Sequence, residues 1–214
     1  EMEPAIHCVA ALLSPSTGII DSHGLMLAYQ GDAEAHGAAL ALLSPVTGGR
    51  IGDDGITLNV GGDEPMEITA NIVVNSAGLW ANKIAHSIAG LNPDTIPAYY
   101  FAKGNYYTLA GRAPFNRPIY PVPGQAGLGV HVTLDMGGQV KFGPDVEWLE
   151  TQNPDELDYI VDPARGESFY EAVRRYYPDL ADGVIQTGYC GIRPKTQAPG
   201  TPAADFHIQG ADEH

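Results

Sequence analysis

Residues 71–88 read Asn-Ile-Val-Val-Asn-Ser-Ala-Gly-Leu-Trp-Ala-Asn-Lys-Ile-Ala-His-Ser-Ile, and this stretch decides the fold class. Residues 71–75 have the apolar, β-branched character of a buried strand, and Ser76-Ala77-Gly78 offers a turn of small residues. Trp80, Ile84 and Ile88 then follow at helical spacing and share one face. A strand, a small turn and a helix in this order are typical of the edge of an α/β unit.

The segments before this unit predict one helix and several strands. A helix is expected over residues 22–35, capped by Asp21, because its apolar residues recur at helical spacing. The apolar run 39–43 predicts a short strand. Residues 56–60 and 66–69 alternate in apolar and polar character on either side of a Gly-Gly-Asp turn, which predicts a hairpin.

Beyond residue 96 the character of the sequence changes. Aromatic and β-branched residues alternate with Gly and Pro as far as residue 143, which predicts antiparallel strands joined by tight turns. The expected strands are residues 99–101, 106–109, 118–122, 129–134 and 139–142, with a hairpin tip at 135–138. Asp162-Pro163 then predicts the start of a helix that ends before Pro178. An α/β part is thus followed by a β-rich part.

Composition and charge exclude several classes of protein. The 214 residues include 11 Lys and Arg against 26 Asp and Glu, and the net charge of −15 repels a nucleic-acid backbone, so no nucleic-acid partner is expected. The apolar runs are far shorter than the roughly 20 residues of a transmembrane helix, so no transmembrane segment is expected. Two cysteines form neither a disulfide framework nor a zinc set, and the scattered histidines predict no metal site. We expect a soluble, cytoplasmic protein.

Two turns carry the strongest ligand-binding signals. Ser76-Ala77-Gly78 follows an expected strand, where open α/β sheets bind ligands and small residues let a flat group approach the backbone. A turn that contacts no ligand would use the same residues. Gly191-Ile192-Arg193-Pro194 presents one guanidinium among apolar neighbours, and Arg binds a carboxylate through two parallel hydrogen bonds. A surface ion pair is the alternative for this arginine.

Three further residues are weaker candidates. His131 and Thr133 lie two residues apart in an expected strand and therefore share a face, although a lone strand histidine is more often a satisfied, half-buried residue. Lys103 precedes an aromatic strand, where a solvated turn lysine is the commoner case. The residues alone predict an α/β plus β protein with the means to bind a small acid.

Several familiar catalytic motifs are missing from the sequence. No Gly-x-Gly-x-x-Gly follows an expected strand, and the glycines of residues 124–129 have the wrong order and lie between β segments. There is no Walker loop, and no His-Glu-x-x-His, Gly-x-Ser-x-Gly or Cys-x-x-Cys.

Six strings of the sequence occur in the same order in one known family. They are Glu3-Pro4-Ala5, Leu13-Ser-Pro-Ser-Thr-Gly-Ile-Ile-Asp21, Val73-Val-Asn-Ser-Ala-Gly-Leu79, Gly127-Leu-Gly-Val-His-Val-Thr133, Phe142-Gly-Pro-Asp145 and Tyr189-Cys-Gly-Ile-Arg-Pro194. With them the chain resembles, over nearly its whole length, the flavin-dependent oxidoreductases of the D-amino-acid oxidase-like superfamily. The Gly-Val-His-Val-Thr and Phe-Gly-Pro-Asp strings are most similar to the L-2-hydroxyglutarate oxidase/dehydrogenase branch.

The resemblance implies an α/β (α+β) fold with a partial FAD-binding Rossmann-like domain and an antiparallel β-rich substrate-binding domain. Residues 16–95 and 186–214 would belong to the FAD-binding domain, and residues 1–15 and 96–185 to the substrate domain. Members of the family begin with a glycine-rich turn that binds the FAD diphosphate and end with a segment that covers the flavin. Because the sequence has neither, we expect an internal fragment, lacking both ends, that is inactive alone and holds no FAD. An exposed apolar strip is also expected beside Val73, because the missing N-terminal unit would have packed there.

The resemblance also implies roles for individual residues. Arg193 would be the catalytic arginine that pairs with the substrate carboxylate, with its guanidinium pointing toward the face that carries His131. His131 would orient the substrate or accept its hydroxyl proton, and Thr133 and Lys103 would help to bind the substrate. The residues expected to contact the cofactor are Val46, Ser76, Ala77, Gly78, Gly191 and Ile192.

The resulting hypothesis is that the full-length enzyme uses FAD to oxidise a small 2-hydroxy acid, with L-2-hydroxyglutarate converted to 2-oxoglutarate as the best guess. The expected partner is a small carboxylate substrate, and oxygen or a quinone remains open as the electron acceptor. One alternative is an amine or amino-acid oxidase that acts on glycine or sarcosine. Another is a small-acid binding module without redox chemistry.

Overall fold

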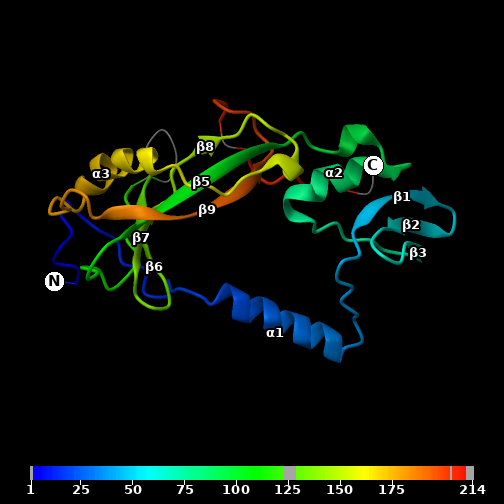
Figure 1. The fold of residues 1–214 in the computed structure, drawn as a ribbon, viewed down its shortest axis with the longest axis horizontal. Coiled ribbons are helices and arrows are strands. Elements are labelled where there is room, and N and C mark those ends of the chain that lie inside the picture. Colours follow the sequence, from blue (N-terminus) through cyan, green and yellow to red (C-terminus); the bar gives the residue numbers. More distant parts are fainter. Residues whose placement is uncertain (1, 123–128, 203, 211–214) are drawn as a thin grey trace. The chain divides into compact units, whose positions relative to one another are not determined.

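The computed structural model describes residues 2–122, 129–202 and 204–210 (Figure 1). The chain forms two compact units, each described here by itself. The first unit comprises Glu1–Tyr29, Ala102–Trp148 and Asp158–Arg193, and the second comprises Gln30–Phe101, Leu149–Leu157 and Pro194–His214. The assignment of a flavin domain and a substrate domain to residue ranges stays a prediction.

The first unit is built on a sheet in which the strand order is β6-β7-β5-β8, with β9 also pairing with β5. Its strands are β5 (Tyr100–Leu109), β6 (His131–Leu134), β7 (Val140–Gly143), β8 (Glu147–Trp148) and β9 (Ile185–Lys195). The pairs β6–β7, β7–β5 and β5–β8 are antiparallel. The mixed α/β fold class and the antiparallel, β-rich character expected after residue 96 are therefore confirmed.

Helix α3 (Gly166–Arg174) covers one face of this sheet and closes its core. The preceding 3-10 turn (Pro163–Arg165) is capped as expected, because the Asp162 carboxylate accepts a hydrogen bond of 2.9 Å from the Ala164 N–H. Phe169 and Val173 of α3 are fully buried, and the Phe169 ring lies 4.5 Å from the Tyr107 ring of β5. Burial of such a side chain contributes roughly 1.5–3 kcal/mol, so the aromatic core dominates the stability of this unit. The core cluster is Tyr107, Leu109, Phe115, Val132, Val140, Phe142, Phe169, Val173, Tyr176 and Leu180.

Strand β5 differs from the sequence-based expectation, which placed two short strands at 99–101 and 106–109. One continuous strand of ten residues includes Lys103 and Gly104. Gly104 packs so closely on Pro144 that a Cβ at this position would lie 2.7 Å from the proline ring, and Lys103 forms an ion pair. Both residues that suggested a turn are thus accommodated inside the strand.

Two other expectations for this part of the chain have different outcomes. The hairpin tip at 135–138 is confirmed, because the Asp135 carboxylate accepts hydrogen bonds of 2.9 Å from the N–H groups of Gly137 and Gln139. The expected strand at 118–122 is wrong: its described contact with the sheet is the single bridge between Ile119 and Val132. Residues 123–128, which include most of the glycine-rich string at 124–129, lie outside the described residues.

The second unit contains a four-stranded sheet with the order β3-β2-β1-β4 (Figure 1). Its strands are β1 (Val46–Gly52), β2 (Gly55–Val60), β3 (Met66–Ala70) and β4 (Ile88–Ala89). Strand β2 pairs antiparallel with β1 and with β3, which confirms the hairpin expected on either side of the Gly-Gly-Asp turn. Strand β4 pairs parallel with β1.

Two strands expected in the second unit are not formed. The run 39–43 is irregular, with Leu43 at a φ of +53°, and the strand begins only at Val46. Residues 71–75 are also irregular, and Ile72 and Val74 are 81% and 79% exposed. A strand needs a hydrogen-bonded neighbour, and the sheet of this unit pairs with neither run. Apolar, β-branched composition alone therefore does not make a strand.

The helical segments of the second unit are shorter than expected. The predicted helix 79–88 is a 3-10 turn (Gly78–Trp80) followed by α2 (Ala81–His86), and Ile88 belongs to strand β4. Two further 3-10 turns, at Pro93–Thr95 and Pro154–Glu156, begin at asparagines whose side chains cap them. Lys83 of α2 and Trp80 both bind the Asp155 carboxylate, which ties the helix to the second of these turns.

Helix α1 (Ser22–Ala35) links the two units and begins as expected, since the Asp21 carboxylate accepts a hydrogen bond of 3.0 Å from the Gly24 N–H. None of its residues is buried, so its apolar spacing does not mark a core face.

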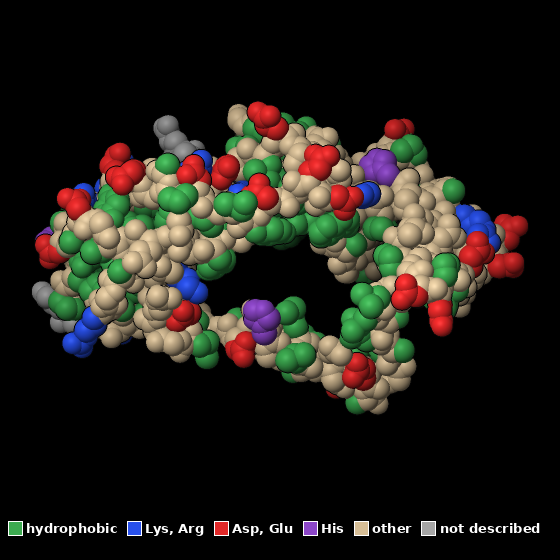
Figure 2. All heavy atoms as spheres, viewed as in Figure 1, with side chains coloured by type: hydrophobic (Ala, Val, Ile, Leu, Met, Phe, Trp, Pro, Cys, Tyr) green, Lys and Arg blue, Asp and Glu red, His purple; other side chains and the backbone are tan. Residues whose placement is uncertain are grey.

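The surface agrees with the acidic composition. Figure 2 shows carboxylates spread over the visible face with few cations among them. Within the described residues, no helix is long and apolar enough to cross a membrane, and no cluster of His, Cys, Asp and Glu has the makings of a metal site.

Candidate active site

One face of the first unit's sheet carries most of the predicted substrate-binding residues. Val132, Phe142 and Tyr107 occupy neighbouring register positions on β6, β7 and β5, and all three point into the core. Side chains alternate along a strand, so the residues next to them point the other way. We call this second side of the sheet the open face. It carries His131, Thr133, Lys141, Tyr106 and Thr108.

Strand β9 extends the open face beyond β5. The Ala110 N–H donates to the Val184 carbonyl, and the backbone of Gly188 lies beside that of Tyr106, so β9 runs antiparallel to β5. The Tyr189 ring stacks on the Tyr106 ring, with centroids 4.7 Å apart and planes only 9° apart. This aromatic pair forms the floor of the open face.

His131 is buried at the edge of the open face. Only 6% of it is exposed, and its ring stacks on Tyr120 with centroids 4.5 Å apart. Burial lowers the pKa of the ring, and the nearby Arg193 charge lowers it further, while the Gly129 backbone acts in the opposite direction. A histidine with a lowered pKa is neutral at pH 7, which leaves one ring nitrogen able to accept a proton.

Arg193 lies near the end of β9 and is exposed. Its guanidinium nonetheless lowers the pKa of both the Tyr106 hydroxyl and His131, although burial raises the pKa of Tyr106 more strongly. Arg193 therefore reaches toward the face that carries His131, and no ion pair among the described residues involves it. Its free charge and its neighbours favour binding of an anion over a surface ion pair.

Lys141 of β7 is a cation on the open face that sequence reasoning missed. Its ammonium lies 5.1 Å from the centroid of the Tyr189 ring, and its side chain is 22% exposed. Tyr106, Tyr120 and Tyr189 were missed in the same way. The alternation of core residues along β5 and β7 is the signal that would have placed Tyr106 and Lys141 on the side of their strands away from the core.

Lys103, which was expected to help bind the substrate, is not part of this face. It lies on the core side of β5, is 5% exposed, and its ammonium is 3.1 Å from the Asp158 carboxylate. Lys103 and Tyr106 are three positions apart along the strand, so the two side chains point to opposite sides.

Near Lys103, Asn105 is fully buried in a polar network. Its side chain donates to Asp145 at 3.0 Å and to Glu147 at 2.9 Å, and Arg165 donates to Asp145 at 2.8 Å. The network joins β5, the start of β8 and the turn before α3, so we assign it a structural role.

The residues expected to contact the cofactor fall in both units. Gly191 and Ile192 are half-buried in β9, and a Cβ at Gly191 would meet nothing within 4 Å. Ser76, Ala77 and Gly78 are exposed in the second unit; Gly78 has a φ of +57° and open space where a Cβ would be. The Asn75 side chain holds this turn by donating to the Ala81 carbonyl at 2.7 Å and accepting from the Ala77 N–H at 3.3 Å. A preorganised turn with open space suits the close approach of a large flat group such as FAD.

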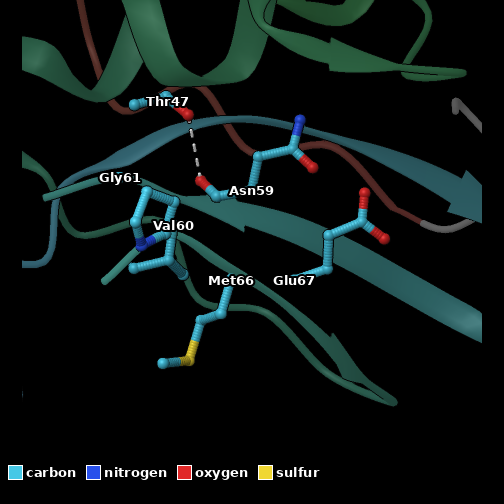
Figure 3. A pocket seen from close by; sticks show the side chains of 7 residues that line it. Thr47, Asn59, Val60, Gly61, Met66 and Glu67 are labelled. Atoms are coloured by element: carbon cyan, nitrogen blue, oxygen red, sulfur yellow. Dashed lines mark hydrogen bonds between the residues drawn. The ribbon is translucent and has the colours of Figure 1, made fainter. Parts of the chain in front are cut away.

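Val46, the last of these residues, begins β1 beside a shallow hollow of about 400 Å³ (Figure 3). Thr47 and Asn59 line its upper side, where the Thr47 hydroxyl donates to the Asn59 carbonyl at 3.2 Å. Glu67, the charged residue in this lining, is paired with Arg50. We find no catalytic group in this hollow among the residues described.

Comparison with known proteins identifies the class to which this fold and site belong. The family described as "FAD dependent oxidoreductase" matches residues 1–212. The chain belongs to this family, which confirms the resemblance noted from the sequence.

Relatives within the family differ in the substrates that their names state. The chain is 41% identical, over 100% of its length, to the mitochondrial L-2-hydroxyglutarate dehydrogenase of Arabidopsis thaliana, of which it covers 51%. It is 27% identical to a glycerol 3-phosphate dehydrogenase of Caloramator mitchellensis, covering 99% of this chain and 42% of that protein. The chain thus spans about half the length of the curated relatives it matches.

Solved structures share the fold. The FAD complex of glycerol-3-phosphate dehydrogenase from Bacillus halodurans aligns with a TM-score of 0.62 at 17% identity, covering 81% of this chain and 35% of that one. Glycine oxidase from Geobacillus kaustophilus aligns with a TM-score of 0.59 at 20% identity, covering 86% of this chain and 44% of that one.

Proposed function

We propose that this chain supplies the substrate-binding face and part of the cofactor site of an enzyme that oxidises L-2-hydroxyglutarate to 2-oxoglutarate. The observation that carries the proposal is the pairing of a buried His131, with its lowered pKa, and a free Arg193 on one face of a sheet. The 41% identity to a plant L-2-hydroxyglutarate dehydrogenase supports the choice of substrate.

In the proposed reaction, Arg193 binds the carboxylate next to the hydroxyl-bearing carbon through two parallel hydrogen bonds. This fixes the hydroxyl group toward His131. His131 is the group placed to accept the hydroxyl proton, because burial keeps its ring neutral. As the C–O bond becomes a carbonyl, the hydrogen on the same carbon would leave with its electron pair, and the chemistry supplied by bound FAD would be that of the hydride acceptor.

The burial of His131 has a direct consequence for this role. A neutral imidazole is present at pH 7 because protonation in a buried position beside Arg193 is disfavoured. The stack on Tyr120 keeps the ring in one orientation. Thr133 and Tyr106 lie on the same face as His131 and contribute hydroxyl groups to substrate binding.

The test is a substrate comparison with the enzyme as its gene encodes it, loaded with FAD. L-2-Hydroxyglutarate, glycine, sarcosine and glycerol 3-phosphate are assayed side by side. Turnover of L-2-hydroxyglutarate with little turnover of the others supports the proposal. Turnover of the amines alone would favour the amino-acid oxidase alternative, and failure of the purified protein to take up FAD before the assay would favour the non-catalytic binding module.

Arg193→Lys provides a sharper test because it keeps the charge but loses the planar pair of donors. We expect kcat/KM to fall by a factor corresponding to about 2 kcal/mol or more, with FAD content unchanged. A normal kcat/KM in this variant would remove Arg193 from the proposed site.

A further inference from the structure

Lys141 extends across the open face instead of projecting into solvent. Its backbone is on β7, its register partner Thr108 is on β5, and its ammonium lies over Tyr189 on β9. The side chain therefore crosses one strand to reach the next. A cation held over a tyrosine ring in this way has a defined position before any ligand arrives.

Lys141 is only loosely paired with its acidic partner, Asp135. The Asp135 Oδ2 is 3.6 Å from the Lys141 ammonium, while Oδ1 of the same carboxylate accepts hydrogen bonds from the Gly137 and Gln139 N–H groups. An ammonium has three donors, and a pair at this distance does not use them fully. Lys141 thus retains capacity to bind a second anionic group.

Lys141 and Arg193 approach the Tyr106–Tyr189 stack from opposite directions along the strands. Lys141 comes from the level of Thr108, whereas Arg193 is four residues beyond Tyr189 and lies near the beginning of β5. The Arg193 charge acts on Tyr106, and the Lys141 charge lies over Tyr189. Two cations thus face one another across an apolar aromatic floor.

From this arrangement we propose that Lys141 binds the distal carboxylate of a dicarboxylate substrate whose other carboxylate is bound by Arg193. The inference rests on the proposed function and deepens it, because it assigns the preference for a dicarboxylate to one residue. A five-carbon diacid has a short methylene chain between its charges, which suits the aromatic floor between the two cations. The competing explanation is structural: Lys141 would only link the 135–138 hairpin tip to Tyr189.

The experiment compares two acids of equal chain length in the FAD-loaded enzyme. L-2-Hydroxyglutarate carries the distal carboxylate, and L-2-hydroxypentanoate has a methyl group in its place. Lys141→Met keeps the apolar stem but removes the charge. We expect kcat/KM for the diacid to fall about 30-fold or more, and kcat/KM for the monoacid to change less than about threefold. Lys141→Arg should recover part of the loss on the diacid.

Equal losses on both acids would overturn the inference and establish the structural explanation. Arg175→Met is the matched control, since it removes an exposed cation at the end of α3, the helix that packs on the core side of the sheet, and should affect neither acid. Binding of glutarate, measured by competition and by thermal shift, separates this inference from the proposed oxidation. If the wild-type enzyme turns over no 2-hydroxy acid, the proposed function fails. Equal binding of glutarate by wild type and Lys141→Met would refute the role of Lys141.

Discussion

The imidazole of His131 and the phenol of Tyr120 stack with their centroids 4.5 Å apart and their planes 26° apart. The contact covers one face of a histidine that is otherwise enclosed by its own sheet. Tyr120 lies in an irregular segment held to the sheet through the bridge between Ile119 and Val132. The environment of His131 therefore depends on a segment outside the regular strands.

The lowered pKa of His131 predicts how stability varies with pH. An unfolded chain has an ordinary histidine pKa of about 6.5, so below that pH the unfolded state binds a proton that the native state resists. The free energy of unfolding should fall as the pH drops from about 6.5 through the native pKa, and this contribution should be constant at higher pH. Denaturant unfolding of wild type and His131→Gln between about pH 5 and 8 measures it. Parallel curves for the two proteins would contradict the prediction.

Gly143 is the position where a single methyl group should disturb the open face most. Its φ is +139°, and an added Cβ would lie 2.7 Å from the Asn105 carbonyl and 2.8 Å from the Tyr106 ring. Backbone strain of about 1–2 kcal/mol and overpacking of about 1–3 kcal/mol add in Gly143→Ala. Gly111→Ala is the control, because its φ is +89° but nothing lies within 4 Å, so it carries strain alone. The difference in stability between the two variants is measured from the midpoints of urea unfolding. Equal losses of stability in both variants would show that Tyr106 moves aside freely.

The network around Asn105 predicts a large effect of a small truncation. Asn105→Ala removes the side-chain donors to Asp145 and Glu147 and leaves these carboxylates less well satisfied. We expect a loss of about 2–4 kcal/mol in the free energy of unfolding. Gln186→Ala, at an exposed position of β9, should change it by less than about 0.5 kcal/mol. A comparable small effect in both variants would mean that water replaces the amide.

Lys103 provides a test of the two faces of β5. Lys103→Met keeps most of the buried stem, and its partner Asp158 is exposed enough to be hydrated without it. Because Lys103 points to the core side, kcat/KM for the 2-hydroxy acid should stay within about twofold of wild type. A selective rise of KM for the 2-hydroxy acid in this variant would show that Lys103 takes part in substrate binding.

Local signals in the sequence predicted much of the fold. The Asp21 and Asp162 caps, the Gly-Gly-Asp hairpin and the 135–138 tip were all predicted, because each depends on residues within a few positions of one another. The strand expected at 71–75 failed for the opposite reason. Its formation depends on a neighbouring strand, which no local pattern can reveal.

The candidate site shows the same division. Thr133 could be placed beside His131 from spacing alone, and the structure puts both on the open face. Lys103 was misplaced because the length of β5 was misjudged: two short strands leave its direction open, whereas one continuous strand fixes it on the core side. Lys141 and Tyr189 meet across three strands, and this proximity follows only from the pairing order of the sheet.

Strand β3 ends its sheet, and its outer backbone groups face away from β2. Met66 and Ile68 on this strand are exposed, and its outer backbone groups pair with no strand among the described residues. Such an edge can template pairing with another chain, whereas the net charge of −15 keeps copies apart at neutral pH. As carboxylates become protonated in acid, that repulsion weakens, whereas the backbone groups of the edge do not titrate. We therefore expect acidic storage buffers to favour self-association through β3.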